Sequence, residues 1–169
     1  MSSRLGVALA IGVASLVLAV LGMVVLRSVV GGPAGITFDG VDTGVAAVAP
    51  FDGLTEAHVA LGDDCLRVVV ADEAGERRDG LRGRTALGPY DAMLFVFPTD
   101  SQARFTMAGV DAPLEIGWYD ADGEPVDRTT MEPCPDGDDC PSYGPAGRYR
   151  YALETSPGAL GPGALAPCG

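Results

Sequence analysis

Arginine clusters are the feature of this sequence with the clearest chemistry. Four arginines fall within eight residues: Arg77, Arg78, Arg82 and Arg84. Arg104 follows in a later segment of strand-like composition. Guanidinium groups bind carboxylates and phosphates through paired, charge-assisted hydrogen bonds, so these side chains could form an anion-binding pocket. The alternative is a solvated surface on which charges pair with one another, because acidic residues are interleaved: Glu73, Glu76 and Asp79.

Patterns for metal binding or nucleophilic catalysis are weak. His58 is the only histidine, so a zinc site would lack a second imidazole ligand. Ser101, Ser142 and Ser156 lie in loop-like contexts without the G-x-S-x-G turn of hydrolases. Residues 120–124 resemble half of a calcium loop, but Asp-Gly between strand-like runs is typical of a hairpin turn. We therefore predict no catalytic residue, no metal site and no cofactor.

The four cysteines all follow the apolar N-terminal segment, and they are Cys65, Cys134, Cys140 and Cys168. An even number of cysteines beyond an export signal favours disulfides over metal thiolates or free thiols. Zinc sites pair cysteines two to four residues apart, whereas five residues separate Cys134 from Cys140. Three connectivities are possible, and we favour Cys134 with Cys140 and Cys65 with Cys168.

The charge balance bears on the choice of partner. All 23 acidic residues follow position 28, together with nine of the eleven arginines, which gives that part a net charge of −14. Binding to nucleic acid depends on a clustered basic surface, and this balance opposes one. We therefore predict that nucleic acid is not a partner.

Residues 5–26 form an apolar stretch without a single charge. A helix of this length reaches across the roughly 30 Å of a bilayer's hydrocarbon core. A cleaved signal peptide has a shorter apolar core and a small-x-small cleavage site close behind it. We expect an uncleaved single-pass anchor within residues 1–27 and an extracytoplasmic C-terminal domain. A secreted protein released by signal cleavage is the alternative, and a buried core helix is a third.

The rest of the chain divides by composition. Residues 28–55 are rich in Gly, Pro, Ala and Asp, which predicts a flexible linker. Residues 56–169 contain short strand-like runs separated by Gly, Pro and Asp turns, including a hairpin around residues 62–64. A short helix should begin at a cap on Asp72 and end at Gly80. This pattern predicts a mainly β domain, a small open barrel or sandwich with one short helix.

Several segments in the same order resemble the domain of unknown function family 192 of bacteria and archaea. They are "ERRDGLRGR" at 76–84, "MLFVF" at 93–97, "RFTM" at 104–107 and "PLEI" at 113–116. The resemblance extends from about residue 65 to 160. It implies a small β-rich domain, often behind a secretory signal or anchor, with no established activity.

The chain departs from this family at residues 106–110. The family usually reads Trp-Met-Lys-Asn-Thr there, whereas this chain reads Thr-Met-Ala-Gly-Val. If the polar trio builds the family's site, this protein has lost that site or remade it with other groups. We expect a ligand to be held mainly by Arg84 and Arg104, oriented by Glu115, and not to be chemically changed.

Two functions of different classes follow. The first is a membrane-tethered extracytoplasmic module that binds a small ligand, an envelope component or a protein partner. The second is an extracytoplasmic enzyme that uses a polar cleft near Arg84, Arg104 and Glu115, and a purely structural envelope protein is a third possibility. A basic cleft with one strongly shifted carboxyl group would favour the enzyme, and an exposed apolar or aromatic groove would favour the binding module.

Overall fold

The computed structural model of the protein describes residues 45–84, 86–134 and 139–168. Within these ranges no helix has the length and apolar character needed to cross a bilayer. The apolar stretch at residues 5–26, on which the predicted anchor depends, lies outside them, as does the linker up to residue 44. The anchor is therefore still a prediction.

One large sheet forms most of the described part of the chain. Its strands follow the order β1-β2-β3-β4-β9-β6-β7, and β10 pairs with β2 beside β1. The bounds are β1 Val45–Ala46, β2 Thr55–Leu61, β3 Asp64–Ala71, β4 Ala92–Ser101, β6 Leu114–Tyr119, β7 Pro125–Met131, β9 Tyr149–Thr155 and β10 Leu165–Pro167. β5 (Phe105–Thr106) and β8 (Ser142–Tyr143) form a separate two-stranded sheet. The expected mainly β fold with one short helix is confirmed, and the predicted small open barrel or sandwich is an open, non-closed sheet.

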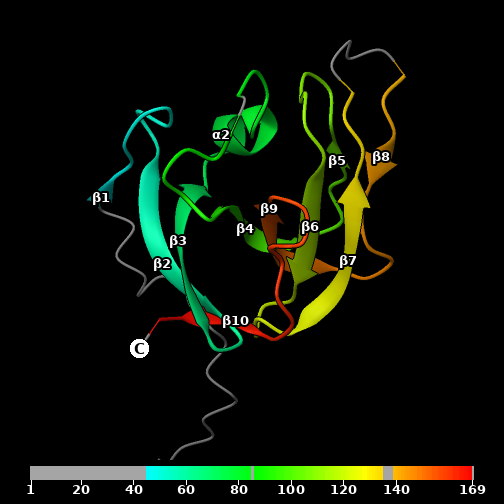
Figure 1. Cartoon of the computed structure of the whole chain (residues 1–169). Coiled ribbons are helices and arrows are strands. Elements are labelled where there is room, and N and C mark those ends of the chain that lie inside the picture. Colours follow the sequence, from blue (N-terminus) through cyan, green and yellow to red (C-terminus); the bar gives the residue numbers. More distant parts are fainter. Residues whose placement is uncertain (1–44, 85, 135–138, 169) are drawn as a thin grey trace, which may run out of the picture. The chain divides into compact units, whose positions relative to one another are not determined.

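The sheet is strongly curved, and α2 (Ala74–Asp79) lies near one end of its strands (Figure 1). Neighbouring strands run antiparallel except β3 and β4, which are parallel. A parallel pair needs a crossover connection, and here that crossover carries α2. The seven-residue strand β9 lies between β4 and β6, so both of its edges are paired.

The helix is capped differently from the sequence expectation. Glu73, and not Asp72, is the N-cap residue, and the helix begins at Ala74. The carboxylate of Glu76 accepts hydrogen bonds from the amides of Asp72 and Glu73, at 3.1 and 3.0 Å. These bonds cap the helix at Glu73, one residue later than expected. Gly80 ends the helix with a positive φ, as predicted.

Apolar side chains pack on both faces of the sheet. In β4, Met93 and Phe95 belong to one buried cluster, whereas Ala92 and Leu94 belong to another. Alternate residues of a strand point to opposite faces, so β4 contributes to both clusters. Each fully buried large side chain stabilises the fold by roughly 1.5 to 3 kcal/mol. Both clusters therefore contribute to the stability of the sheet.

The folded part begins earlier than the boundary expected at Glu56. β1 pairs with β2, and the Phe51 side chain is completely buried. Phe51 packs edge-on against Tyr90, and the Arg84 guanidinium lies 4.4 Å from the centre of the Phe51 ring. At least residues 45–55 therefore belong to the domain and not to a linker.

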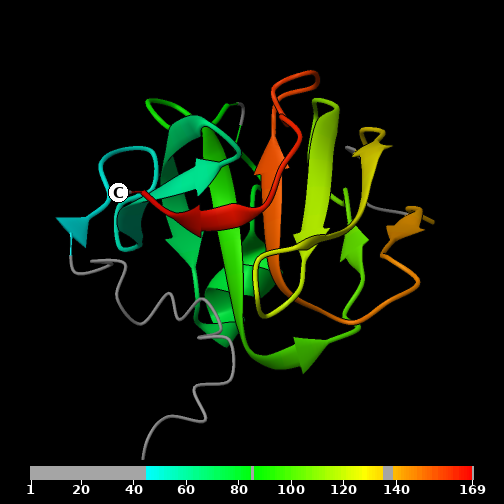
Figure 2. The ribbon, with the colours of Figure 1, turned by 90° about the horizontal axis from the view of Figure 1, so that it is seen from below.

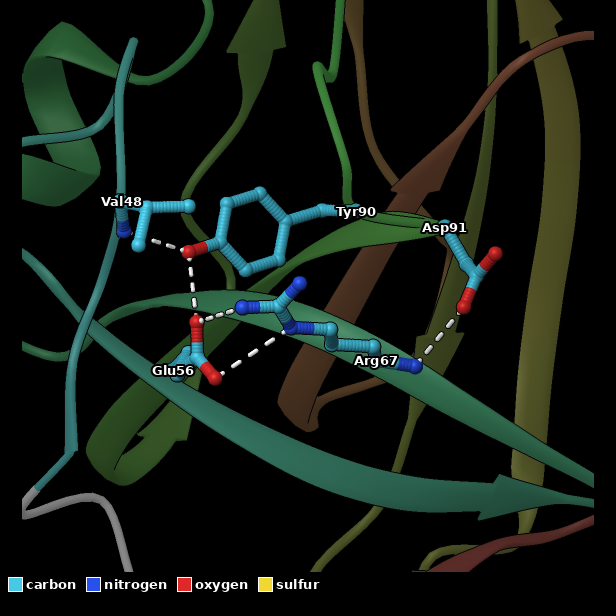
Figure 3. Close-up of polar contacts among 5 residues, drawn as sticks. All are labelled: Val48, Glu56, Arg67, Tyr90 and Asp91. Carbon is cyan, nitrogen blue, oxygen red and sulfur yellow. Dashed lines mark hydrogen bonds and ion pairs between the residues drawn. The ribbon is translucent and has the colours of Figure 1, made fainter.

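A polar network joins this N-terminal segment to β2, β3 and the start of β4 (Figure 3). Arg67 contacts both carboxylate oxygens of Glu56, at 3.2 and 2.6 Å, and its own amide donates to Asp91. The Tyr90 hydroxyl donates to Glu56 at 2.7 Å and accepts from the Val48 amide at 2.7 Å. Every member has a partner, so this network serves the scaffold.

The predicted hairpin and both preferred disulfides are present. Leu61 of β2 faces Asp64 of β3 across the turn, where Gly62 has a positive φ. A Cβ at Gly62 would lie 2.7 Å from the Pro162 carbonyl oxygen, so only glycine lets the C-terminal segment approach this turn. β10 runs beside β2 as a result (Figure 2).

The two disulfides brace different regions. Cys65 in β3 is bonded to Cys168, and their Cα atoms are 5.9 Å apart. Cys134 is bonded to Cys140, also with 5.9 Å between Cα atoms. The Cys134 carbonyl accepts a 2.9 Å hydrogen bond from the Gly109 amide. The short disulfide loop therefore supports the segment in which this chain lacks the polar trio.

Candidate functional site

A pocket of about 280 Å³ lies between α2, β4, β9 and the segment that follows β4. Four arginines line it: Arg77, Arg78, Arg82 and Arg104. We call this cavity the arginine pocket. Its volume is close to the lower end of the roughly 300 to 1,000 Å³ typical of small-molecule sites. The pocket therefore suits a compact ligand.

The wall of the arginine pocket is apolar, with both aromatic and aliphatic side chains. Three aromatic rings line it, from Phe95, Phe97 and Phe105. Four aliphatic side chains complete it: Leu81, Met107, Val110 and Leu114. Phe95 and Phe105 pack edge to face, with 5.1 Å between ring centres. Such paired rings give the wall a fixed shape.

Two of the four arginines are held by the protein itself. Arg77 donates to the carbonyl oxygens of Asp72 and Val96 and lies 5.2 Å from the centre of the Phe97 ring. Arg104 donates from two nitrogens to the side chain and carbonyl of Ser142, both at 2.5 Å. These two guanidinium groups therefore position α2 and β8 while they line the pocket.

The other two arginines are more available to a ligand. Among the described residues, the Arg78 side chain forms only an exposed ion pair with Asp79, at 3.5 Å. Arg82 is exposed, and its guanidinium has no hydrogen bond or ion pair with any residue in the described ranges. An exposed pair such as Arg78 with Asp79 contributes little to stability. Arg82 and Arg78 are thus the cations that an incoming anion would meet.

Glu154 is the unexpected member of the arginine pocket. It belongs to β9, opposite Met93 of β4 and Ile116 of β6, and only 6% of its surface is exposed. No hydrogen bond or ion pair joins its side chain to the described part of the chain. Burial raises the pKa of the Glu154 carboxyl group to about 8. At neutral pH this group is therefore mostly uncharged.

Arg84, Arg104 and Glu115 are not brought to one place. Arg104 lines the arginine pocket, and Arg84 lines an adjacent pocket of about 230 Å³ that shares Leu81, Val110 and Leu114 with it. Glu115 belongs to the lining of neither, and its carboxylate accepts a hydrogen bond from the Gly158 amide at 3.0 Å.

Arg84 serves the scaffold. Besides its contact with the Phe51 ring, it donates a hydrogen bond to the Pro50 carbonyl oxygen. Both partners belong to the segment that the sequence predicted to be a linker. Contacts with this segment, which the sequence does not predict, occupy the Arg84 guanidinium. In the structure its guanidinium anchors the N-terminal segment to the domain.

Sequence reasoning grouped Arg82 with the possible anion site but overlooked Glu154. The run "RYRYALE" predicts a strand, and a terminal glutamate in such a run is ordinarily solvent-exposed. Only the pairing of β9 with strands on both sides reveals that this carboxyl group is buried. No local sequence signal marks it.

Metal binding gains no support from the described residues. They contain no group of three or more His, Cys, Asp or Glu side chains that could hold a metal ion. The possible calcium loop at 120–124 is a hairpin turn, in which the Asp120 carboxylate accepts from the amides of Asp122 and Glu124 at 2.9 and 3.0 Å.

The sequence profile of the DUF192 family, described as an uncharacterised ACR, matches residues 57–165. This range contains every strand that lines the arginine pocket. No curated protein matches the chain.

Two crystal structures resemble the fold. A protein of unknown function from Novosphingobium aromaticivorans is 26% identical, with a TM-score of 0.58, and the match covers 70% of this chain and 90% of that one. A protein from Sinorhizobium meliloti, named as a candidate transcription regulator, is 22% identical, with a TM-score of 0.56 and coverages of 66% and 93%. At this identity the second similarity concerns the fold alone.

Proposed function

Since the chain belongs to the uncharacterised DUF192 family, we propose a function from its own site: binding of a small organic anion in the arginine pocket. The observation that carries this proposal is the combination of an apolar wall with the unpaired guanidinium of Arg82. Such a pocket attracts a molecule with an apolar body and a carboxylate or phosphate.

Overall charge supports the same proposal. The chain carries a net charge of −12, yet four of its eleven arginines line this single pocket. Most of an acidic surface repels anions, so the pocket is where an anion would be attracted. Nucleic acid is too large for this cavity and is repelled by the rest of the surface.

The cellular setting is part of the proposal. Residues 5–26 would anchor the protein in the membrane, and the domain would bind its ligand on the extracytoplasmic side. The two disulfides support an extracytoplasmic location of the domain, because disulfides persist in oxidising compartments. Intact-mass measurement of membrane-extracted protein tests the anchor, since a mature N-terminus after Arg27 would contradict it.

An enzyme is the second candidate, and Glu154 favours it. A carboxyl group with a pKa of about 8 in a basic pocket has the protonation state of a general acid. However, the pocket offers no clear second group for catalysis. Among the described residues that line the pocket, the other carboxylate, Asp79, is exposed and paired with Arg78. Binding without chemical change is therefore the function we place first.

Calorimetric titration tests the binding function. The full-length chain in a mild detergent is titrated with 4-methylbenzoate, phenyl phosphate and the neutral 4-methylbenzamide. Both anions should bind, and the amide should bind at least ten-fold more weakly. Arg82→Ala should weaken binding of the anions about ten-fold or more, because a charge-assisted hydrogen bond contributes roughly 1.5 to 3 kcal/mol.

Arg128→Ala is the matched control. Arg128 is an exposed arginine on β7 outside the pocket lining, so its removal changes the net charge equally and should leave binding unchanged. Failure of both anions to bind, or equal affinities in wild type and Arg82→Ala, would refute the proposal. Turnover of phenyl phosphate, lost in Glu154→Gln, would instead favour the enzyme.

A further inference from the structure

The burial of the pocket's polar groups is graded, and this gradient restricts the ligand. Arg78, Arg82 and Arg104 are exposed, whereas only 6% of the Glu154 surface is exposed. All four line the same cavity. A bound molecule therefore meets cations at the outer end and a carboxyl group at the inner end.

The inner carboxyl group has an unused hydrogen bond to give. Buried polar groups in proteins almost always have a partner, and an exception calls for an explanation. Glu154 has none within the described ranges. Its neighbours across the strands, Met93 and Ile116, are apolar and fully buried, so they offer no partner. A ligand atom is the natural candidate for that partner.

We propose, on the basis of the binding function above, that the arginine pocket recognises small organic anions with a hydrogen-bond acceptor, such as a carbonyl oxygen, at the inner end, and that the Glu154 carboxyl group donates a hydrogen bond to this acceptor. The outer carboxylate or phosphate of the same ligand contacts Arg82. Keto acids with a compact apolar body are the simplest members of this class.

A cationic inner group fits the pocket less well. The arginines at the outer end repel an entering ammonium group. Burial keeps Glu154 protonated at neutral pH, with its pKa raised to about 8, so it does not offer a negative charge. The neutral carboxyl group can donate a hydrogen bond to a carbonyl oxygen without first losing its proton. Acceptors are therefore preferred to cations.

The preference for a ligand with a hydrogen-bond acceptor at its inner end should disappear in alkaline solution. Above pH 8 the ionised Glu154 has no proton to donate, and its charge repels a carbonyl oxygen. The other charged groups that face this space are Arg77, Arg78, Asp79, Arg82 and Arg104. Arginine and aspartate side chains keep their charge between pH 6 and 9. Glu154 is therefore the group that would govern a change in this range.

Titration with 4-acetylbenzoate and 4-isopropylbenzoate tests the inference, because the two anions differ mainly in one carbonyl oxygen. For the full-length chain at pH 6.5, the acetyl compound should bind about three- to ten-fold more tightly, the effect of one neutral hydrogen bond. At pH 9 this ratio should fall to about one. In Glu154→Gln the ratio should persist at both pH values, because an amide still donates.

Glu154→Leu should bind both compounds equally at every pH. If this variant does not fold, Glu154→Gln still decides the matter through its pH profile. Equal affinity of the wild type for both compounds at pH 6.5 would overturn the inference while leaving the binding function intact. So would tighter binding of 4-(aminomethyl)benzoate than of 4-acetylbenzoate. Failure of all these benzoates to bind would count against the binding function itself.

Discussion

Two buried carboxyl groups of this protein have opposite surroundings. The Glu56 carboxylate accepts hydrogen bonds from Arg67 and Tyr90. These bonds, chiefly the one from Arg67, lower the pKa of Glu56. Glu154 has no such partner among residues 45–84, 86–134 and 139–168, and burial raises its pKa to about 8. Glu56 joins three segments of the scaffold, whereas Glu154 lines a cavity. The same residue type thus stabilises the fold at one position and is available to a ligand at the other.

This contrast separates structural from functional polar groups. A satisfied network contributes to stability and leaves nothing for a ligand. An unsatisfied carboxyl group costs stability, and such costs are concentrated at functional sites. The arginines divide in the same way: the guanidinium groups of Arg67 and Arg84 bind protein groups, whereas that of Arg82 has no hydrogen bond or ion pair within the described ranges.

The scaffold is weakened most by loss of the long disulfide. Replacing Cys65 and Cys168 by Ser should lower the free energy of unfolding by about 4 to 5 kcal/mol, because the bond spans 103 residues and restricts the unfolded chain. The Cys134–Cys140 loop spans six residues, so its removal should cost about 2 kcal/mol. Denaturant titration measures both losses, and equal losses would contradict this account.

Replacing Glu154 by Gln should have the opposite effect and stabilise the protein. The pKa of this group is about 8 in the fold against 4.5 for the unperturbed group, so stability falls as pH rises from about 4.5 to about 8. The amide cannot ionise, so the variant should gain roughly 3 kcal/mol at pH 7 and lose this pH dependence. Unfolding curves at pH 5 and pH 8 are the measurement, and a destabilised variant at pH 8 would count against it.

Glu56 should produce the reverse pH dependence. Its pKa is lowered in the fold, so its contribution is present above about pH 4.5 and is lost as pH falls below that value. In Glu56→Gln the loss of stability should therefore be larger at pH 7 than at pH 3. Circular dichroism melts at the two pH values provide the test, with Arg128→Ala as an exposed control. An equal loss at both values would show that Glu56 titrates normally.

A smaller effect is expected from Tyr90→Phe. The change removes hydrogen bonds to Glu56 and from the Val48 amide while keeping the ring that packs on Phe51. The free energy of unfolding should fall by roughly 2 kcal/mol. Affinity for 4-methylbenzoate should not change, because Tyr90 does not line the arginine pocket. Weaker ligand binding by the folded variant would show that the Glu56 network and the arginine pocket are not independent.

Much of the fold could be predicted from local sequence patterns. The hairpin at residues 62–64 and the glycine that ends α2 depend on short-range turn chemistry. The number and placement of the four cysteines predict disulfides, but they leave three connectivities open, and the structure contains the favoured one. The start of the domain was placed too late, because the burial of Phe51 depends on distant partners such as Tyr90.

The site was less predictable for the same reason. The sequence predicts Arg84 and Arg104 as available cations, but both guanidinium groups bind remote segments, through Pro50, Phe51 and Ser142. Glu154 was overlooked because its burial depends on β4 and β6 on either side of it. Local composition describes turns and strands well, but it does not show which charges are already paired.

The most direct test of this account is a carbon-13 NMR titration of the Glu154 carboxyl group in the full-length chain, assigned by comparison with Glu154→Gln. We predict a midpoint near pH 8, because burial without a partner raises the pKa. Saturating 4-acetylbenzoate should move this midpoint upward, since the ligand accepts a hydrogen bond from the protonated form. A midpoint at the ordinary value of a glutamate, unchanged by the ligand, would contradict the account.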